Sequence, residues 1–97
     1  MIDIRCTEGE ITLSGHAHYA ESGKDIVCAG ISALVQSLIQ SIEELTQDKI
    51  QYSMSPGRVD IKFRDLSEPA QLLVNSFFVG VKQIADNYPK HVKLTKP

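Results

Sequence analysis

The sequence is poor in cysteine and has no concentration of positive charge. It contains two cysteines in 97 residues, its formal net charge is −2, and its ten lysines and arginines are scattered along the chain. Nucleic-acid binding through general neutralisation of phosphates needs a basic stripe, so we expect no direct nucleic-acid partner. Inside a cell, two cysteines more often stay reduced than form a disulfide, so both are expected to be free thiols.

Signals that direct a chain out of the cytoplasm are also lacking. The first ten residues, MIDIRCTEGE, have neither the basic region nor the apolar run of a secretory signal. No window is expected to reach the length of a membrane span. We therefore expect a cytoplasmic protein without membrane contact. The chain also lacks a Gly-rich phosphate loop, internal repeats and linkers, so residues 1–97 are expected to form a single domain with one modest core.

Two stretches of alternating apolar and polar residues, each interrupted by a turn, predict two β-hairpins. The first has strands in residues 2–6 and 10–14 around Glu8-Gly9, and the second has strands in residues 50–54 and 59–63 around Ser55-Pro56-Gly57. Alternation places Cys6 on the buried face of the first hairpin, where a small thiol is mostly a core filler.

Helical periodicity covers residues 25–46, and a second helix is predicted between the cap Ser67 and Pro89. The apolar seam of the first helix is Val27, Ile31, Leu34, Leu38, Ile42 and Leu45, flanked by Val35 and Ile39. Val92 and Leu94 suggest a short last strand. The order β-β-α-β-β-α-β predicts an α+β fold of two layers, with both helices on one antiparallel sheet. The apolar arc of residues 27–45 is broader than one small sheet needs, which predicts a homodimer.

The stretch from Gly15 to Ser32, GHAHYAESGKDIVCAGIS, holds the residues that could carry chemistry. A cysteine attacks as the thiolate, and a free thiol is mostly protonated at neutral pH. If Asp25 is the N-cap, Cys28 is the third residue of the helix, where free N–H groups and the helix dipole stabilise an anion and could also hold an oxyanion. His16, across the loop, could take the thiol proton. Asp25 could orient that imidazole or could merely cap the helix.

Other interpretations of these residues stay open. Cys28 could be a structural thiol, since free cysteine is among the most buried residue types, and the Ser32 hydroxyl could simply bond a backbone carbonyl. His16, His18 and Cys28 are also ligand types that zinc accepts, but the sequence offers no fourth ligand near them. Alternation places Cys6 on the opposite face of the hairpin from His16, and His91 is remote in the chain. The loop 17–24 is longer than its connection requires, a weak indication of function.

Gly15-His16-Ala17, followed by Gly23, Asp25-Ile26-Val27-Cys28-Ala29 and Ser32, resembles the ribosomal-processing cysteine protease family, Prp. The resemblance covers essentially the whole chain. It implies that His16 and Cys28 form a catalytic dyad and that Asp25 and Ser32 support it. His18 departs from the residues usual in the family, which leaves the details of the loop open.

The resemblance further implies an intracellular endopeptidase that works as a homodimer, with no metal or other cofactor. Its substrate would be a large-subunit ribosomal protein made with an N-terminal extension, which is cleaved after a short motif ending in an aromatic residue. The loop residues Ala17, His18, Tyr19 and Gly23 would close over the extended peptide. The competing hypothesis is a non-catalytic, ribosome-associated binding module, suggested by the small size and the broad apolar helix face.

Overall fold

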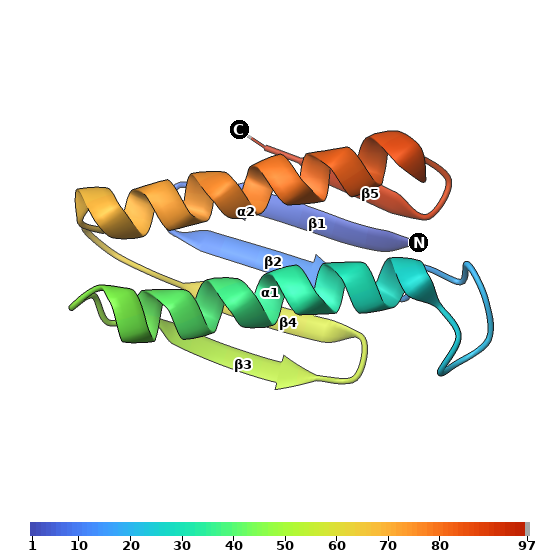
Figure 1. The fold of residues 1–97 in the computed structure, drawn as a ribbon, viewed down its shortest axis with the longest axis horizontal. Helices are drawn as coiled ribbons and strands as arrows, with labels where there is room; N and C mark the ends of the chain where they lie inside the picture. Colours follow the sequence, from blue (N-terminus) through green and yellow to red (C-terminus); the bar gives the residue numbers. More distant parts are fainter. Residues whose placement is uncertain (97) are drawn as a thin grey trace.

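Residues 1–96, the part of the chain that the computed structural model describes, form five strands and two helices in the order that the sequence predicts. These elements are β1 (Ile2–Thr7), β2 (Glu10–Ser14), α1 (Ile26–Leu45), β3 (Gln51–Ser55), β4 (Arg58–Lys62), α2 (Glu68–Asn87) and β5 (Val92–Thr95). Both helices lie on one face of the sheet, which gives two layers (Figure 1). The predicted α+β fold class is confirmed.

The sheet is mixed rather than antiparallel throughout. Its strand order is β3-β4-β2-β1-β5, and the pairs β3–β4, β4–β2 and β2–β1 are antiparallel, whereas β1–β5 is parallel. The parallel pair corrects the all-antiparallel expectation. Its cause is the helical crossover through α2, which returns the chain so that β5 runs in the same direction as β4 and β1 (Figure 1).

The core lies between the sheet and the helices. Ile4, Ile11 and Ile61 face the helices from the three central strands and are completely buried, as is Ile42 of α1. Burial of a side chain of this size stabilises the folded state by about 1.5–3 kcal/mol. The alternation that predicted the strands therefore marks the side of the sheet that the helices cover.

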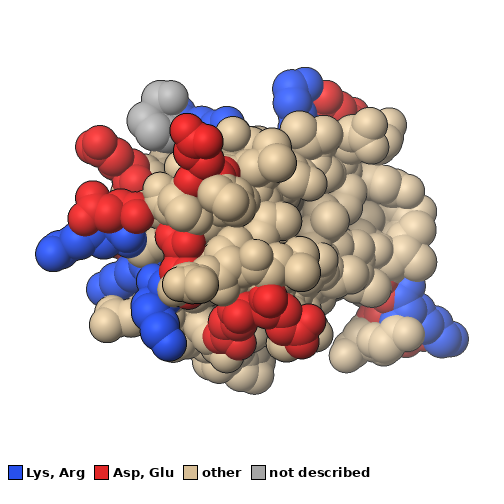
Figure 2. Space-filling view, turned by 60° about the vertical axis from the view of Figure 1, so that its left-hand side comes forward, with Lys and Arg blue, Asp and Glu red and all other residues tan. Residues whose placement is uncertain are grey.

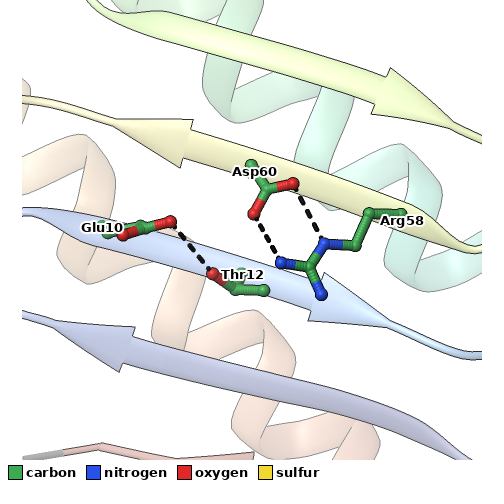
Figure 3. A network of polar contacts seen from close by, with 4 residues as sticks. All are labelled: Glu10, Thr12, Arg58 and Asp60. Atoms are coloured by element: carbon green, nitrogen blue, oxygen red, sulfur yellow. Dashed lines mark hydrogen bonds and ion pairs between the residues drawn. The ribbon is translucent and has the colours of Figure 1, made fainter.

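The opposite face of the sheet is polar. Arg58 donates from Nε and Nη2 to the two carboxylate oxygens of Asp60, both at 3.0 Å, and Thr12 donates to Glu10 at 3.5 Å (Figure 3). The hydrogen bonds from Arg58 hold the pKa of Asp60 below its ordinary value. These residues alternate with the buried ones, as the pleat of a strand requires.

The buried stripe of α1 lies to one side of the predicted seam. Val35 and Ile39, expected on the flank, are buried, whereas Leu34 is only partly buried and Leu45, the last helical residue, is 71% exposed. Leu34 packs instead against α2, where a Cβ placed on Gly80 would lie 3.1 Å from the leucine methyl groups. Contact with the second helix, which periodicity alone does not reveal, therefore sets the rotation of α1.

By length and composition alone, α1 could cross a membrane, and among the described residues it is the one helix of which this is true. The expectation that no window reaches the length of a membrane span is therefore wrong on this criterion. The helix buries Val27, Ile31 and Val35 in the cluster that includes the sheet residues Ile4 and Ile11. About 33% of the apolar window is buried inside the domain.

Cys6 lies beside the core rather than inside it. It is half-buried, packs against the buried cluster and pairs with Ile11 in the β1–β2 ladder. The predicted buried face is therefore right, although the side chain is less enclosed than expected. Burial raises the pKa of its thiol above the ordinary value. Cys6 and Cys28 are both free thiols, as expected.

Candidate active site

Cys28 lies at the start of α1, where the loop from β2 enters the helix. The helix begins at Ile26 with Asp25 as its N-cap, so Cys28 is the third helical residue, as predicted. Its side chain is half-buried, packs against the core cluster and lines a cavity. The thiol therefore lies at the border between the core and an open site, close to the positive end of the helix dipole.

Asp25 ties the helix start to the loop with separate oxygens. Its Oδ1 accepts the N–H groups of Val27 and Cys28, both at 3.0 Å. Its Oδ2 accepts the N–H of Tyr19 at 2.9 Å and that of Ala20 at 3.4 Å. These bonds, of which the one from Cys28 has the largest effect, hold the pKa of Asp25 below its ordinary value. Of the two roles left open for Asp25, the structure shows the helix cap, to which it adds a tether for the loop.

The backbone of Ala17 contacts the sulfur directly. Its N–H donates to Cys28 Sγ at 3.3 Å, and its side chain is buried, with 1% exposed. The N–H groups of Val27 and Cys28 are already bound by Asp25. Two of the first-turn N–H groups that were expected to be free for an oxyanion are therefore occupied by the helix cap. The backbone donor beside the sulfur comes from the loop instead.

His16 and Cys28 line the same two cavities, of about 630 and 250 Å³. The imidazole of His16 lies against the turn between β3 and β4, since a Cβ placed on Gly57 would come within 2.9 Å of Nε2. Gly57 has a φ of +74°, and its carbonyl accepts the N–H of Gly15 at 2.9 Å. The position of His16 therefore depends on a hairpin turn far along the chain.

The two cavities differ in their walls. The larger is bounded by the loop and the first turn of α1, whereas the smaller lies between α1 and the β3–β4 hairpin. Ser32, one turn after Cys28, lines both. Apolar side chains form much of the wall of the smaller cavity, namely Ile2, Leu13, Ile31, Val35, Met54 and Val59.

The four predicted loop residues divide into two groups. His18 and Gly23 line the larger cavity. Ala17 is buried, and Tyr19 lies outside the cavity with its ring edge-on to Tyr88 and His91, at 5.3 and 5.4 Å between ring centroids. The loop is therefore partly packed onto the end of α2 rather than free along its whole length.

Sequence reasoning missed Gly57 and His91. His91, expected to be remote, has its Nδ1 2.8 Å from the carbonyl oxygen of Ala17. A glycine after a proline in a turn does signal positive φ, but nothing in the pattern connects that turn to His16. The parallel β5 strand brings His91 to the loop, and the sequence did not predict that pairing.

The zinc alternative requires His16, His18 and Cys28 to converge. The rings of the two histidines are 6.0 Å apart between centroids. Among residues 1–96, no three His, Cys, Asp or Glu side chains gather closely enough to hold a metal ion. The structure instead shows the Cys28 thiol with one backbone N–H donor, from Ala17, and with His16 in the wall of the same cavities.

Comparison with known proteins places this arrangement in a family. A family model described as "Cysteine protease Prp" matches residues 1–93. The ribosomal processing cysteine protease Prp of Staphylococcus aureus is 33% identical over 93 residues, which cover 90% of this chain and 88% of the relative. The protein of the same name from Mycoplasma genitalium is 31% identical over 100 residues, which cover 99% of this chain and 96% of the relative.

The fold is shared as well. The crystal structure of the ribosomal processing protease Prp from S. aureus, in complex with a covalently linked product peptide, matches with a TM-score of 0.90 at 27% identity. The match covers 99% of this chain and 97% of that one. Similarity therefore extends over the whole fold and not only over the segment around Cys28. The chain belongs to the Prp family of ribosomal processing cysteine proteases.

Proposed function

We propose that the chain is an endopeptidase in which Cys28 is the nucleophile and His16 is the general base and acid. The observation that carries the proposal is the setting of the Cys28 sulfur, which accepts the N–H of Ala17 at 3.3 Å and faces cavities that His16 also lines. A helix N-terminus and a backbone donor both stabilise negative charge on sulfur. The covalently linked product peptide of the S. aureus relative supports a covalent route.

The reaction has two stages. His16 takes the thiol proton, and the thiolate of Cys28 attacks the scissile carbonyl carbon to form a C–S bond. The C–N bond then breaks as the imidazolium gives its proton to the leaving amine, which leaves a thioester on Cys28. In the second stage His16 takes a proton from water as the water oxygen attacks the thioester carbon. The C–S bond breaks, the proton passes to the sulfur, and the product leaves with a new carboxyl terminus.

Asp25 and Ser32 have supporting roles in this proposal. Asp25 accepts four backbone N–H groups, two from the helix start and two from the loop, and so keeps Cys28 and Ala17 in a fixed relative position. Ser32 offers its hydroxyl to both cavities, one turn after Cys28, where it can bond the backbone of a bound peptide. Neither residue exchanges a proton with substrate.

The proposed substrate is the N-terminal extension of a large-subunit ribosomal protein, removed in the cytoplasm before ribosome assembly. Family membership and the names of the relatives support a substrate in ribosomal processing. The peptide would lie in the larger cavity beside His18 and Gly23. The aromatic residue before the cleaved bond would enter the smaller cavity, whose apolar wall includes Leu13 and Met54. An aromatic side chain buries a large apolar area, which favours selectivity at that position.

We also propose that residues 1–97 act as a single domain that pairs with a second copy through the exposed flank of α1. No Asp, Glu, Lys or Arg occurs in residues 26–42 of α1 or 69–81 of α2. Figure 2 shows a wide area without such side chains between the charged groups at the ends of the helices. Beside α1, Tyr52 and Met54 of β3 are each 48% exposed. Sedimentation at micromolar concentration should give a dimer, and a monomer alone would contradict the pairing.

Two substitutions test the catalytic proposal. Cys28→Ala should abolish cleavage of a peptide that copies the junction between the extension and the mature ribosomal protein. Cys6→Ala, the matched control at the other thiol, should retain nearly all of it. Replacing the aromatic residue before the cleaved bond by alanine should lower kcat/KM. Cleavage that survives Cys28→Ala, or is lost in Cys6→Ala, would overturn the assignment of the nucleophile.

A further inference from the structure

The turn between α2 and β5 reaches the candidate active site through His91. Nδ1 of His91 lies 2.8 Å from the carbonyl oxygen of Ala17. A carbonyl oxygen only accepts hydrogen bonds, so Nδ1 carries a proton and donates it to this bond. Ala17 is also the residue whose N–H donates to Cys28 Sγ at 3.3 Å. One residue of the loop is therefore bound on its carbonyl side by His91 and on its N–H side by the sulfur.

His91 is itself held in place. Its N–H donates to the carbonyl of Tyr88 at 2.9 Å, and its own carbonyl accepts the N–H of Ile2 at 2.8 Å. The residue is half-buried, and the ring of Tyr19 lies edge-on to its imidazole. These contacts fix His91 to both α2 and β1. The backbone of His91 is therefore anchored, and its imidazole packs against the loop at Tyr19.

The loop turns sharply just after Ala17. His18 has a φ of +54°, in the left-handed region that a non-glycine residue enters only at a cost in free energy. On one side of it the Ala17 carbonyl is bound by His91, and on the other the Tyr19 N–H is bound by Asp25 at 2.9 Å. If either bond is lost, the backbone can relax at His18. We expect such relaxation to shift the neighbouring backbone of Ala17 and to weaken the bond from its N–H to the sulfur.

We propose that His91 is a positioning residue, which keeps the Ala17 N–H aimed at Cys28 Sγ by donating to the Ala17 carbonyl. Its effect on the reaction is indirect, because it contacts neither the sulfur nor the cavities described above. The proposal rests on the proposed role of Cys28 as nucleophile. It assigns to the α2–β5 turn a part in maintaining the reactive state of that thiol.

Two variants separate the hydrogen bond from the packing of the ring. His91→Phe keeps a ring against Tyr19 but removes the donor, whereas His91→Asn loses the ring but keeps an N–H donor near the position of Nδ1. Both are made in the Cys6→Ala background, where Cys28 is the single thiol. The measurements are the rate constant for alkylation of Cys28 by iodoacetamide at pH 7, the kcat and KM for cleavage of the junction peptide, and the thermal unfolding midpoint.

We expect His91→Phe to slow alkylation and to lower kcat by roughly three- to tenfold with little change in KM. The reason is that the hydrogen bond from the Ala17 N–H to the negatively charged Cys28 sulfur is weakened. His91→Asn should restore most of the loss. If His91→Phe fails to fold, His91→Ala replaces it, since it adds no bulk. A purely structural role predicts instead that both variants lower the unfolding midpoint and leave the alkylation rate of the folded protein unchanged.

The positioning role is overturned if His91→Phe alkylates and cleaves at the parental rate, or if His91→Asn is as slow as His91→Phe. The nucleophile is tested separately by Cys28→Ala in the parental chain. Cleavage that survives Cys28→Ala removes the proposed function as a whole. Cleavage that is lost in Cys28→Ala while His91→Phe has no effect removes only the role of His91.

Discussion

Replacing Gly57 with alanine should displace His16 while leaving Cys28 untouched. Gly57 has a φ of +74°, and a non-glycine residue in this left-handed region costs about 1–2 kcal/mol. The new Cβ would also lie 2.9 Å from His16 Nε2 and 3.4 Å from its Cε1, and the first of these is closer than real Cβ contacts come. The imidazole is the free end of an exposed side chain, so the ring moves rather than the turn. A displacement of about 1 Å in a catalytic group lowers turnover by on the order of a hundredfold.

Gly23→Ala is the matched control for the backbone cost. Gly23 has a φ of +87°, and apart from its own chain neighbours no described residue lies within 4 Å of a Cβ built there, so the strain is similar and His16 stays in place. Urea unfolding should show a loss of about 1–2 kcal/mol in both variants. A shift of the His16 ring protons in NMR spectra should appear only in Gly57→Ala, where kcat for the junction peptide should fall with it. Gly23 lines the proposed peptide cavity, so Gly23→Ala is the control for stability and for the His16 resonances, and not for kcat. Parental kcat in Gly57→Ala, or equal shifts of the His16 resonances in Gly23→Ala, would refute the reasoning.

Three further outcomes are expected. Because the pKa of Asp25 is lowered in the folded state, its contribution to stability is present above the ordinary aspartate value of about 4 and is lost as pH falls through the lower folded value. Acid unfolding followed by circular dichroism should therefore be less steep below pH of about 4 in Asp25→Asn, and an unchanged profile would contradict the tether. Burial raises the pKa of the Cys6 thiol, and the thiolate is the form that iodoacetamide alkylates, so at pH 8 Cys28 should be labelled first. Peptide mass mapping measures the order of labelling, and faster labelling of Cys6 would count against the site. Ser67→Ala removes the N-cap of α2 and should lower the free energy of unfolding in urea by about 1 kcal/mol. Ser76→Ala, at an exposed position inside the same helix, should lower it by almost nothing, and equal losses in the two variants would contradict the cap.

Local signals in the sequence predicted most of the fold. Alternation located the four hairpin strands, and the capping residues Asp25 and Ser67 marked the helix starts, because these features depend on neighbours a few residues away. The parallel pairing of β5 with β1 and the rotation of α1 toward α2 were not predicted. Both depend on contacts between segments that are distant in the chain, for which a period of two or 3.6 residues carries no information.

At the site, too, the sequence predicted what depends on near neighbours in the chain and not what depends on tertiary contacts. The placement of Cys28 at the third helical position followed from its spacing to Asp25. The donor beside its sulfur did not, because the Ala17 N–H is a backbone group whose direction depends on the path of the loop. The contacts of His16 with Gly57 and of Ala17 with His91 likewise arise from tertiary structure. Residue types and their spacing therefore predicted the candidate reacting groups, and only the fold showed which residues lie against them.

Mass spectrometry of the acid-quenched reaction tests the role of Cys28 most directly. The enzyme is mixed with the junction peptide, quenched within the first turnover and digested with trypsin. The peptide spanning Asp25 to Lys49 should carry the mass of the N-terminal product fragment as a thioester on Cys28. Attachment of that fragment to Cys6, or cleavage through a full turnover with no adduct on either cysteine, would contradict the assignment of Cys28 as the nucleophile.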